Sequence, residues 1–260
     1  MADNGRVTLR SMPSLARALP IALVAALAGA CSSVSETSAG ISVDVLSAPV
    51  RSPTADGSWT VVNDLGLEIQ VTRGYLVTAS LELLPCASLA ARALDALHSL
   101  VEGRALAHPA ASPMRLALSH VERLGGAPGP AGPTTLGAIL PPPGRYCRAR
   151  YTAAAADGDA VGLPARPALV GKSLYLEGTY RRPPQPARQF LLWSDRALTV
   201  DTPLAALELS GETPTATLLV RKDVRRWFEG VDLATATPEA AAAAVLANIA
   251  TPTSVMVEAQ

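Results

Sequence analysis

Three histidines and a methionine lie between the second and third cysteines of this 260-residue chain: His98, His108, His120 and Met114. Imidazole nitrogen and thioether sulfur together are ligands that suit copper. The histidines are spaced ten and twelve residues apart, which matches no dense metal-ligand motif, and His98 falls on a predicted helix where it would be solvated. A loop could bring the other three together, so we predict His108, His120 and Met114 as candidate copper ligands.

Recognisable catalytic motifs are absent from the sequence. No Gly-x-Ser-x-Gly turn presents a serine nucleophile. The run Gly171-Lys172-Ser173 matches only the end of a phosphate-binding loop, because Arg166 stands where that motif has its earlier glycine. We therefore expect a protein that is not an enzyme.

The N-terminal residues 1–30 have the layout of a secretory signal. Arg6, Arg10 and Arg17 precede the uncharged run Leu19–Ala30. This run is short for a membrane-spanning helix, which needs about 20 apolar residues. A basic start, a short apolar core and small residues at the exit are typical of an export signal.

The run Leu27-Ala28-Gly29-Ala30-Cys31 resembles the lipobox of bacterial lipoproteins, whose cysteine is acylated and becomes the mature N-terminus. The resemblance implies a lipid anchor on Cys31, a polar tether over residues 31–40 and a place in the bacterial cell envelope. Ser32 in second position is similar to the outer-membrane sorting pattern, on the periplasmic or the surface face. An ordinary signal peptide, cut near Ala30, is the alternative.

The predicted mature chain is almost neutral. Removing residues 1–30 takes away three Arg and one Asp and leaves 19 basic and 21 acidic residues, a net charge of −2. A nucleic-acid-binding surface normally needs a basic excess, so we expect no nucleic-acid partner.

Cys86 and Cys147 are the two cysteines beyond Cys31. In an oxidising envelope compartment such a pair is most simply a disulfide. It would close a loop of roughly 60 residues and add about 4 kcal/mol of stability. Two separate buried thiols are the alternative.

Alternating apolar and polar residues predict a chain built mainly of strands. Arg73-Gly74 interrupts the longest alternation and predicts two antiparallel strands there. In the run after Gly144, we expect Tyr146 and Arg148 on one face and Cys147 and Tyr151 on the other. Residues 114–124 fit a strand or a short helix. The strands are expected at residues 41–46, 58–62, 65–72, 75–83, 145–151, 169–180, 189–193, 204–209 and 215–220.

Three segments change to a helical period. Residues 87–103 predict an amphipathic helix, Asp223 caps a short helix, and Pro238 opens an Ala-rich helix over 239–249. The last residues are expected to trail away. Together these patterns predict one all-β domain over residues 41–260, an antiparallel β-sandwich of immunoglobulin-like style with helical insertions.

A second resemblance rests on three runs in order: the strand at Gly74-Tyr75, the segment 174–179 (LYLEGT) and the segment 220–233 with Trp227-Phe228. Over about half of the mature chain, this succession resembles MbnP-type envelope β-proteins, which bind copper. The resemblance implies a similar fold. Our first functional prediction is a non-enzymatic, membrane-anchored binding or scaffold lipoprotein with an envelope protein partner. The alternative is an envelope copper-binding protein.

Overall fold

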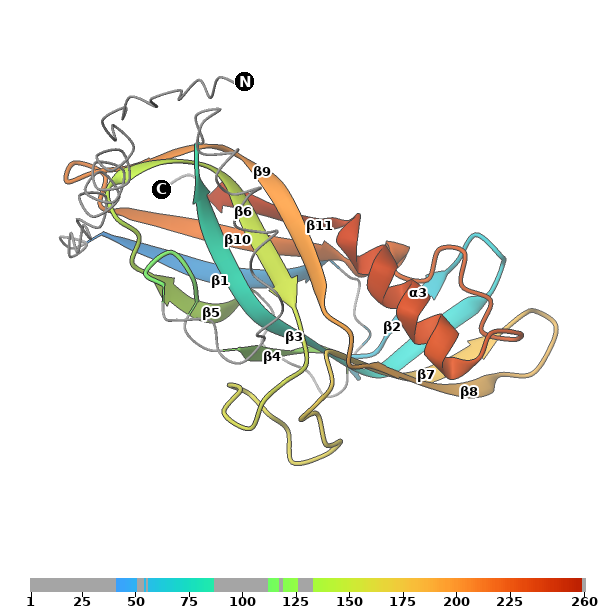
Figure 1. Ribbon diagram of the computed structural model, residues 1–260. Coiled ribbons are helices and arrows are strands. Elements are labelled where there is room, and N and C mark those ends of the chain that lie inside the picture. Colours follow the sequence, from blue (N-terminus) through green and yellow to red (C-terminus); the bar gives the residue numbers. More distant parts are fainter. Residues whose placement is uncertain are drawn as a thin grey trace, which may run out of the picture. The chain divides into compact units, whose positions relative to one another are not determined.

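The computed structural model describes residues 41–50, 54, 56–86, 112–116, 119–125 and 133–258 (Figure 1). Most of these residues lie in strands, joined by one 3-10 helix, η1, and one α-helix, α3. The elements are β1 (Ser42–Val50), β2 (Trp59–Val62), β3 (Glu68–Pro85), β4 (His120–Gly125), β5 (Thr134–Ile139), β6 (Gly144–Ala153), β7 (Leu174–Arg181), β8 (Arg188–Ser194), β9 (Leu198–Leu209), β10 (Thr215–Asp223), η1 (Val224–Arg226), α3 (Pro238–Ala250) and β11 (Thr253–Glu258).

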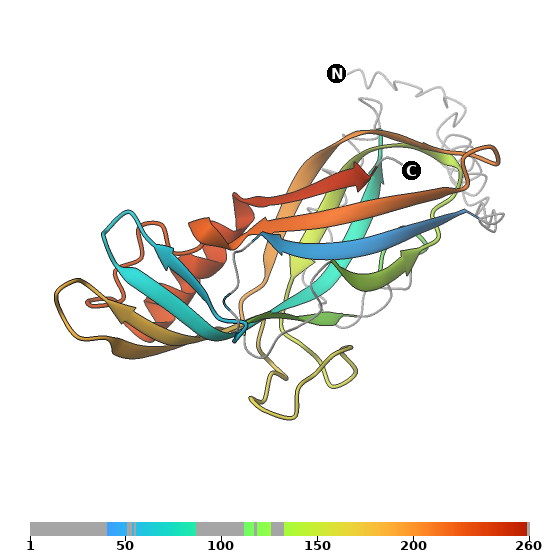
Figure 2. The ribbon, with the colours of Figure 1, turned by 180° about the vertical axis from the view of Figure 1, so that it is seen from behind.

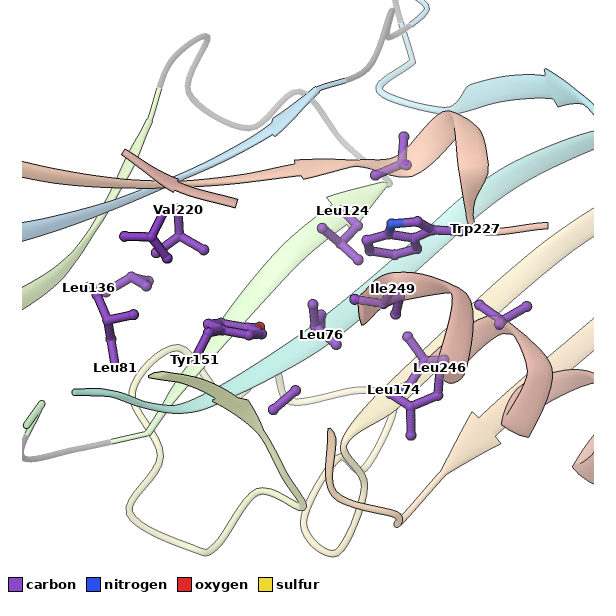
Figure 3. Packing of buried hydrophobic residues seen from close by; sticks show 14 of the residues in the cluster. Leu76, Leu81, Leu124, Leu136, Tyr151, Leu174, Val220, Trp227, Leu246 and Ile249 are labelled. Carbon is purple, nitrogen blue, oxygen red and sulfur yellow. The ribbon is translucent and has the colours of Figure 1, made fainter. Parts of the chain in front are cut away.

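The strands form two sheets, which confirms the predicted all-β, sandwich-like fold. The four-stranded sheet has the order β11-β10-β1-β5, and the larger sheet has the order β8-β7-β3-β6-β9, with β2 and β4 also paired to β3. All pairings between these strands are antiparallel except β1 with β10. The two sheets are seen from behind in Figure 2. One hydrophobic cluster joins them, with Val45 and Val220 from one sheet and Leu81 and Tyr151 from the other. Figure 3 shows Val220, Leu81 and Tyr151 in this cluster.

The predicted break at Arg73-Gly74 is wrong. β3 is one 18-residue strand that runs through these residues, with register shifts against β7 and β4 at this point. A Cβ on Gly74 would lie 3.0 Å from a methyl carbon of Leu176 and 3.2 Å from Cβ of Leu124. The glycine therefore marks an irregular, closely packed point inside a strand rather than a turn.

The predicted faces of β6 need a correction. Tyr146 is buried, as are Ala149 and Tyr151, although simple alternation places Tyr146 opposite Tyr151. The pairing of β6 with β9 shifts register between Tyr146 and Arg148. A bulge adds one residue to a strand and so inverts the alternation, which brings all three side chains to the core.

The segment 114–124, which fits either a strand or a short helix, contains most of β4. Its described residues also form two isolated bridges, from Arg115 to Glu82 and from His120 to Val161. The helix predicted over 87–103 lies outside the described residues. No described helix is long and apolar enough to cross a membrane.

The C-terminal helix forms as predicted. α3 begins at Pro238, with the Thr237 side chain accepting a hydrogen bond from the Ala240 N–H, and Asp223 caps η1 in the same way. The expectation that the last residues trail away is wrong, because β11 pairs with β10 over Thr217–Lys222. Thr253 and Val255 alternate inward on β11, and this buried face holds the strand against the core.

Candidate functional site

The predicted disulfide is present. Cys86, just after β3, is bonded to Cys147 on β6, with the two Cα atoms 4.8 Å apart. The two cysteines meet because β3 and β6 pair directly, with Pro85 opposite Tyr146. The bond therefore fastens one end of the longest strand to its neighbour.

The candidate metal ligands are only partly described. Cys31, His98 and His108 lie outside the described residues. His120 lies on β4, and a Cβ on Gly137 would be 4.0 Å from its Nε2 atom, whereas Met114 packs against the main hydrophobic cluster. Within the described ranges, no three His, Cys, Asp or Glu side chains form a group that could hold a metal ion. The copper site stays a prediction.

Among the described titratable groups, His120 has the ordinary pKa that lies closest to neutral pH. Burial lowers the pKa of its imidazole below 6.5, and the nearby Glu122 carboxylate offsets part of this effect. As the pH falls through 6.5, the unfolded chain therefore binds the proton before the folded protein does. The contribution of His120 therefore lowers the free energy of unfolding as the pH falls through this window.

We expect His120→Gln to weaken this pH dependence. Urea unfolding at pH 7.5 and pH 5.5 should show a smaller loss of stability on acidification in the variant than in the parent chain, because glutamine does not titrate. The two other histidines are present in both chains and cancel in the comparison. An identical pH dependence in both chains would contradict the assignment.

A cluster of five polar side chains lies inside the hydrophobic core, and we call it the buried polar cluster. Its members come from five strands and are almost completely buried: Ser47 on β1, Thr78 on β3, Glu122 on β4, Tyr151 on β6 and Lys222 on β10.

An ion pair forms the centre of the buried polar cluster. The Lys222 ammonium donates to both carboxylate oxygens of Glu122 at 2.9 Å and to the Ser47 hydroxyl at 2.7 Å. Ser47 and Thr78 each donate a hydrogen bond to Glu122, so its oxygens accept four hydrogen bonds. The Tyr151 hydroxyl lies 2.9 Å from Thr78 Oγ1, and its ring centroid is 4.9 Å from Lys222 Nζ.

Burial dominates the electrostatics of this cluster. It lowers the pKa of Lys222, which the adjacent Glu122 partly restores, and it raises the pKa of Tyr151 well above 10. These groups satisfy one another's hydrogen-bonding capacity and are shielded from solvent. We therefore expect the buried polar cluster to affect the stability of the folded state. Sequence analysis missed the cluster, although Lys222 is in phase with the buried Leu218 and Val220 on β10.

One face of β3, β7 and β8 combines exposed apolar side chains with polar and charged groups. The strand register places Tyr175 opposite Trp193, Glu177 opposite Leu191 and Thr179 opposite Gln189. We call this surface the outer face; with its β3 neighbours it comprises Thr72, Arg73, Tyr175, Glu177, Thr179, Gln189, Leu191 and Trp193.

Two large apolar side chains of the outer face are half-exposed. Leu191 and Trp193 are each 48 % exposed, while Phe190 and Leu192, which alternate with them along β8, point into the core, towards the side where α3 packs on β8. Leu191 also lines an open groove of about 540 Å³ that runs over Thr72, Glu177 and Thr179.

The charges of the outer face are largely matched to one another. Glu177 accepts a hydrogen bond from the Tyr175 hydroxyl at 2.8 Å and pairs with Arg73 at 3.3 Å. Burial and the contact with Glu177 raise the pKa of Tyr175 to about 12, so its hydroxyl stays protonated near neutral pH. Lys172 Nζ lies 5.7 Å from the ring centroid of Trp193. The outer face therefore has an apolar edge on β8 beside polar groups that are held in place on β3 and β7.

Comparison with known proteins adds no assignment: no family model, no curated protein and no solved structure matches this chain.

Proposed function

We propose that this protein is a non-enzymatic binding or scaffold lipoprotein of the bacterial cell envelope, anchored through Cys31 and binding its partner with the outer face. The observation that carries the proposal is the half-exposed pair Leu191 and Trp193 on β8, the terminal strand of its sheet. Large apolar side chains cost free energy when they stay in water, and a partner that covers them recovers it.

The composition of the outer face supports protein binding. Tryptophan and arginine are enriched among the residues that dominate binding energy, and a polar border excludes water around them. Here Trp193 and Leu191 form the apolar edge of the face, and Arg73, Glu177 and Gln189 lie beside them. The backbone of this surface is held in a hydrogen-bonded sheet, so binding would cost little ordering of the main chain.

The anchor is tested by Cys31→Ser. Without an acyl acceptor, the protein should leave the membrane fraction and appear in the soluble fraction, because the acyl chains supply about 0.8 kcal/mol per buried CH2. Ser33→Ala, two residues further on, is the matched control and should remain with the membrane. Membrane retention of the Cys31→Ser protein would refute the lipid anchor, and a parent chain that is already soluble would indicate an ordinary cut near Ala30.

A further inference from the structure

We propose that this protein also binds a phosphate group, in a small cavity at the connection between β7 and β8, with Arg182 and Arg188 as the side chains that hold it. The cavity has a volume of about 30 Å³, and its walls include Tyr180, Arg182, Gln185 and Arg188. The connection lies at one end of the larger sheet, beyond the labels of β7 and β8 in Figure 1.

The cavity is separate from the outer face. Tyr180 on β7 is paired with Arg188 on β8, and directly opposite residues of an antiparallel pair share a face. Arg188 is in phase with the buried Phe190, whereas Leu191 is in the opposite phase. Arg188 therefore belongs to the core side of the sheet, and the proposed phosphate site is independent of the proposed function.

Positive charge is concentrated around this cavity. Residues 178–194 contain three arginines and no acidic residue. Arg181 forms an ion pair with Glu68, so its charge is matched. Arg182 and Arg188 are exposed, and their guanidinium groups form no ion pair or hydrogen bond with any other described residue. Two unmatched positive charges therefore border one cavity.

The walls of the cavity supply no carboxylate to neutralise these arginines. The described lining residues include the apolar Leu67 and Ala234 and no Asp or Glu. Asp232, the acidic residue nearest to Ala234 in the sequence, is engaged within its own loop. Its carboxylate accepts hydrogen bonds from the Ala234 N–H at 3.0 Å and from the Thr235 hydroxyl at 3.1 Å. The positive charge is thus left for a ligand.

The backbone of the β7–β8 connection is restrained before any ligand binds. The Gln185 N–H donates a hydrogen bond of 2.8 Å to the Arg182 carbonyl, which closes a turn. Prolines at positions 183, 184 and 186 fix the φ angle at three of the six connecting residues. Binding would therefore order little more than the arginine side chains.

The two guanidinium groups suit phosphate. The planar fork of arginine N–H donors matches the oxygens of a phosphate group, and such charge-assisted hydrogen bonds are strong. A phosphate monoester carries a charge of about −1.5 to −2 near pH 7, which two arginines balance, whereas a carboxylate carries one. A cavity of this size has room for only a few water-sized atoms, so we expect it to take phosphate oxygens and leave the rest of a ligand outside.

Isothermal titration calorimetry with inorganic phosphate tests the site. The full chain carrying Cys31→Ser should bind one phosphate, and Arg182→Gln or Arg188→Gln should each weaken binding by about tenfold or more, because each removes a charge-assisted hydrogen bond. Arg196→Gln is the matched control. It replaces an exposed arginine without an ion pair to a described residue, beyond the other end of β8, and should bind like the parent chain. Equal urea midpoints would show that all four chains are folded.

Vesicle flotation separates the two sources of a phosphate group. Phosphatidylcholine vesicles with and without phosphatidic acid, a lipid phosphate monoester, would be mixed with the same chains. Flotation that requires phosphatidic acid and is lost in Arg188→Gln would identify a lipid headgroup. Binding of inorganic phosphate without a preference for these vesicles would identify a soluble phosphate.

Two results would overturn the inference. One is the absence of both saturable binding up to about 10 mM inorganic phosphate and any preference for phosphatidic acid. The other is an equal loss of binding in Arg196→Gln, which would show general attraction to positive charge instead of a site. Neither result would affect contacts made by Leu191, so the proposed function can stand or fall separately.

Discussion

Lys222→Met should lower the free energy of unfolding by about 3–5 kcal/mol, the usual cost of removing one partner of a buried ion pair. Lys222 is completely buried and Glu122 almost so, and the two are joined by two hydrogen bonds of 2.9 Å. Methionine fills a similar volume, so little of the loss would come from packing. The loss would arise because the Glu122 carboxylate stays in the core without a counter-charge.

A second variant separates charge from packing. Lys222→Met combined with Glu122→Gln removes both charges and leaves an amide that can still bond to Ser47 and Thr78. We expect the double variant to be more stable than Lys222→Met alone, which urea unfolding monitored by circular dichroism would measure. If the double variant loses as much stability as the sum of the two single variants, the charges are not coupled and our description of the cluster is wrong.

Replacing both Cys86 and Cys147 by alanine should cost about 4 kcal/mol, because the bond closes a long loop in the unfolded chain. The two residues are 61 positions apart. The loss should be seen as a lower urea midpoint, and the parent chain unfolded with a reducing agent should show a similar decrease. Cys31→Ser is the control that leaves the loop closed and the midpoint unchanged. A loss below about 1 kcal/mol would contradict this account of the disulfide.

Most strands could be predicted from the sequence because each has one buried face. β7, for example, alternates Leu174, Leu176 and Gly178 with Tyr175, Glu177 and Thr179, and the even-numbered residues are the ones that face the core. The disulfide between Cys86 and Cys147 could also be predicted from the sequence, because the chain has only three cysteines. Both inferences depend on local pattern or on counting, which need no knowledge of partner strands.

Features that depend on distant partners could not be predicted. Glycine usually signals a turn, yet Gly74 lies inside β3 because Leu124 and Leu176 from two other strands fill the space of its side chain. The alternation of β10 indicates that the Lys222 side chain points into the core. Nothing in the local sequence indicates that it forms an ion pair with Glu122, which is 100 residues away.

The binding surface was hidden for a different reason. Phe190, Leu191, Leu192 and Trp193 are all apolar, so the sequence of β8 does not tell which face is buried. The packing of α3 against β8 decides it, and this leaves Leu191 and Trp193 exposed. Without the position of this helix, Gln189–Trp193 indicates only a strand.

The most direct test of the central claim, that the outer face is a binding surface in the envelope, is site-specific photo-cross-linking in cells. A photoreactive phenylalanine analogue would replace Leu191 in one strain and Val62 on β2 in a control strain. We predict a cross-linked product at position 191 that is absent at position 62. The absence of any product at position 191, from a protein that is exported and folded, would contradict the proposed function.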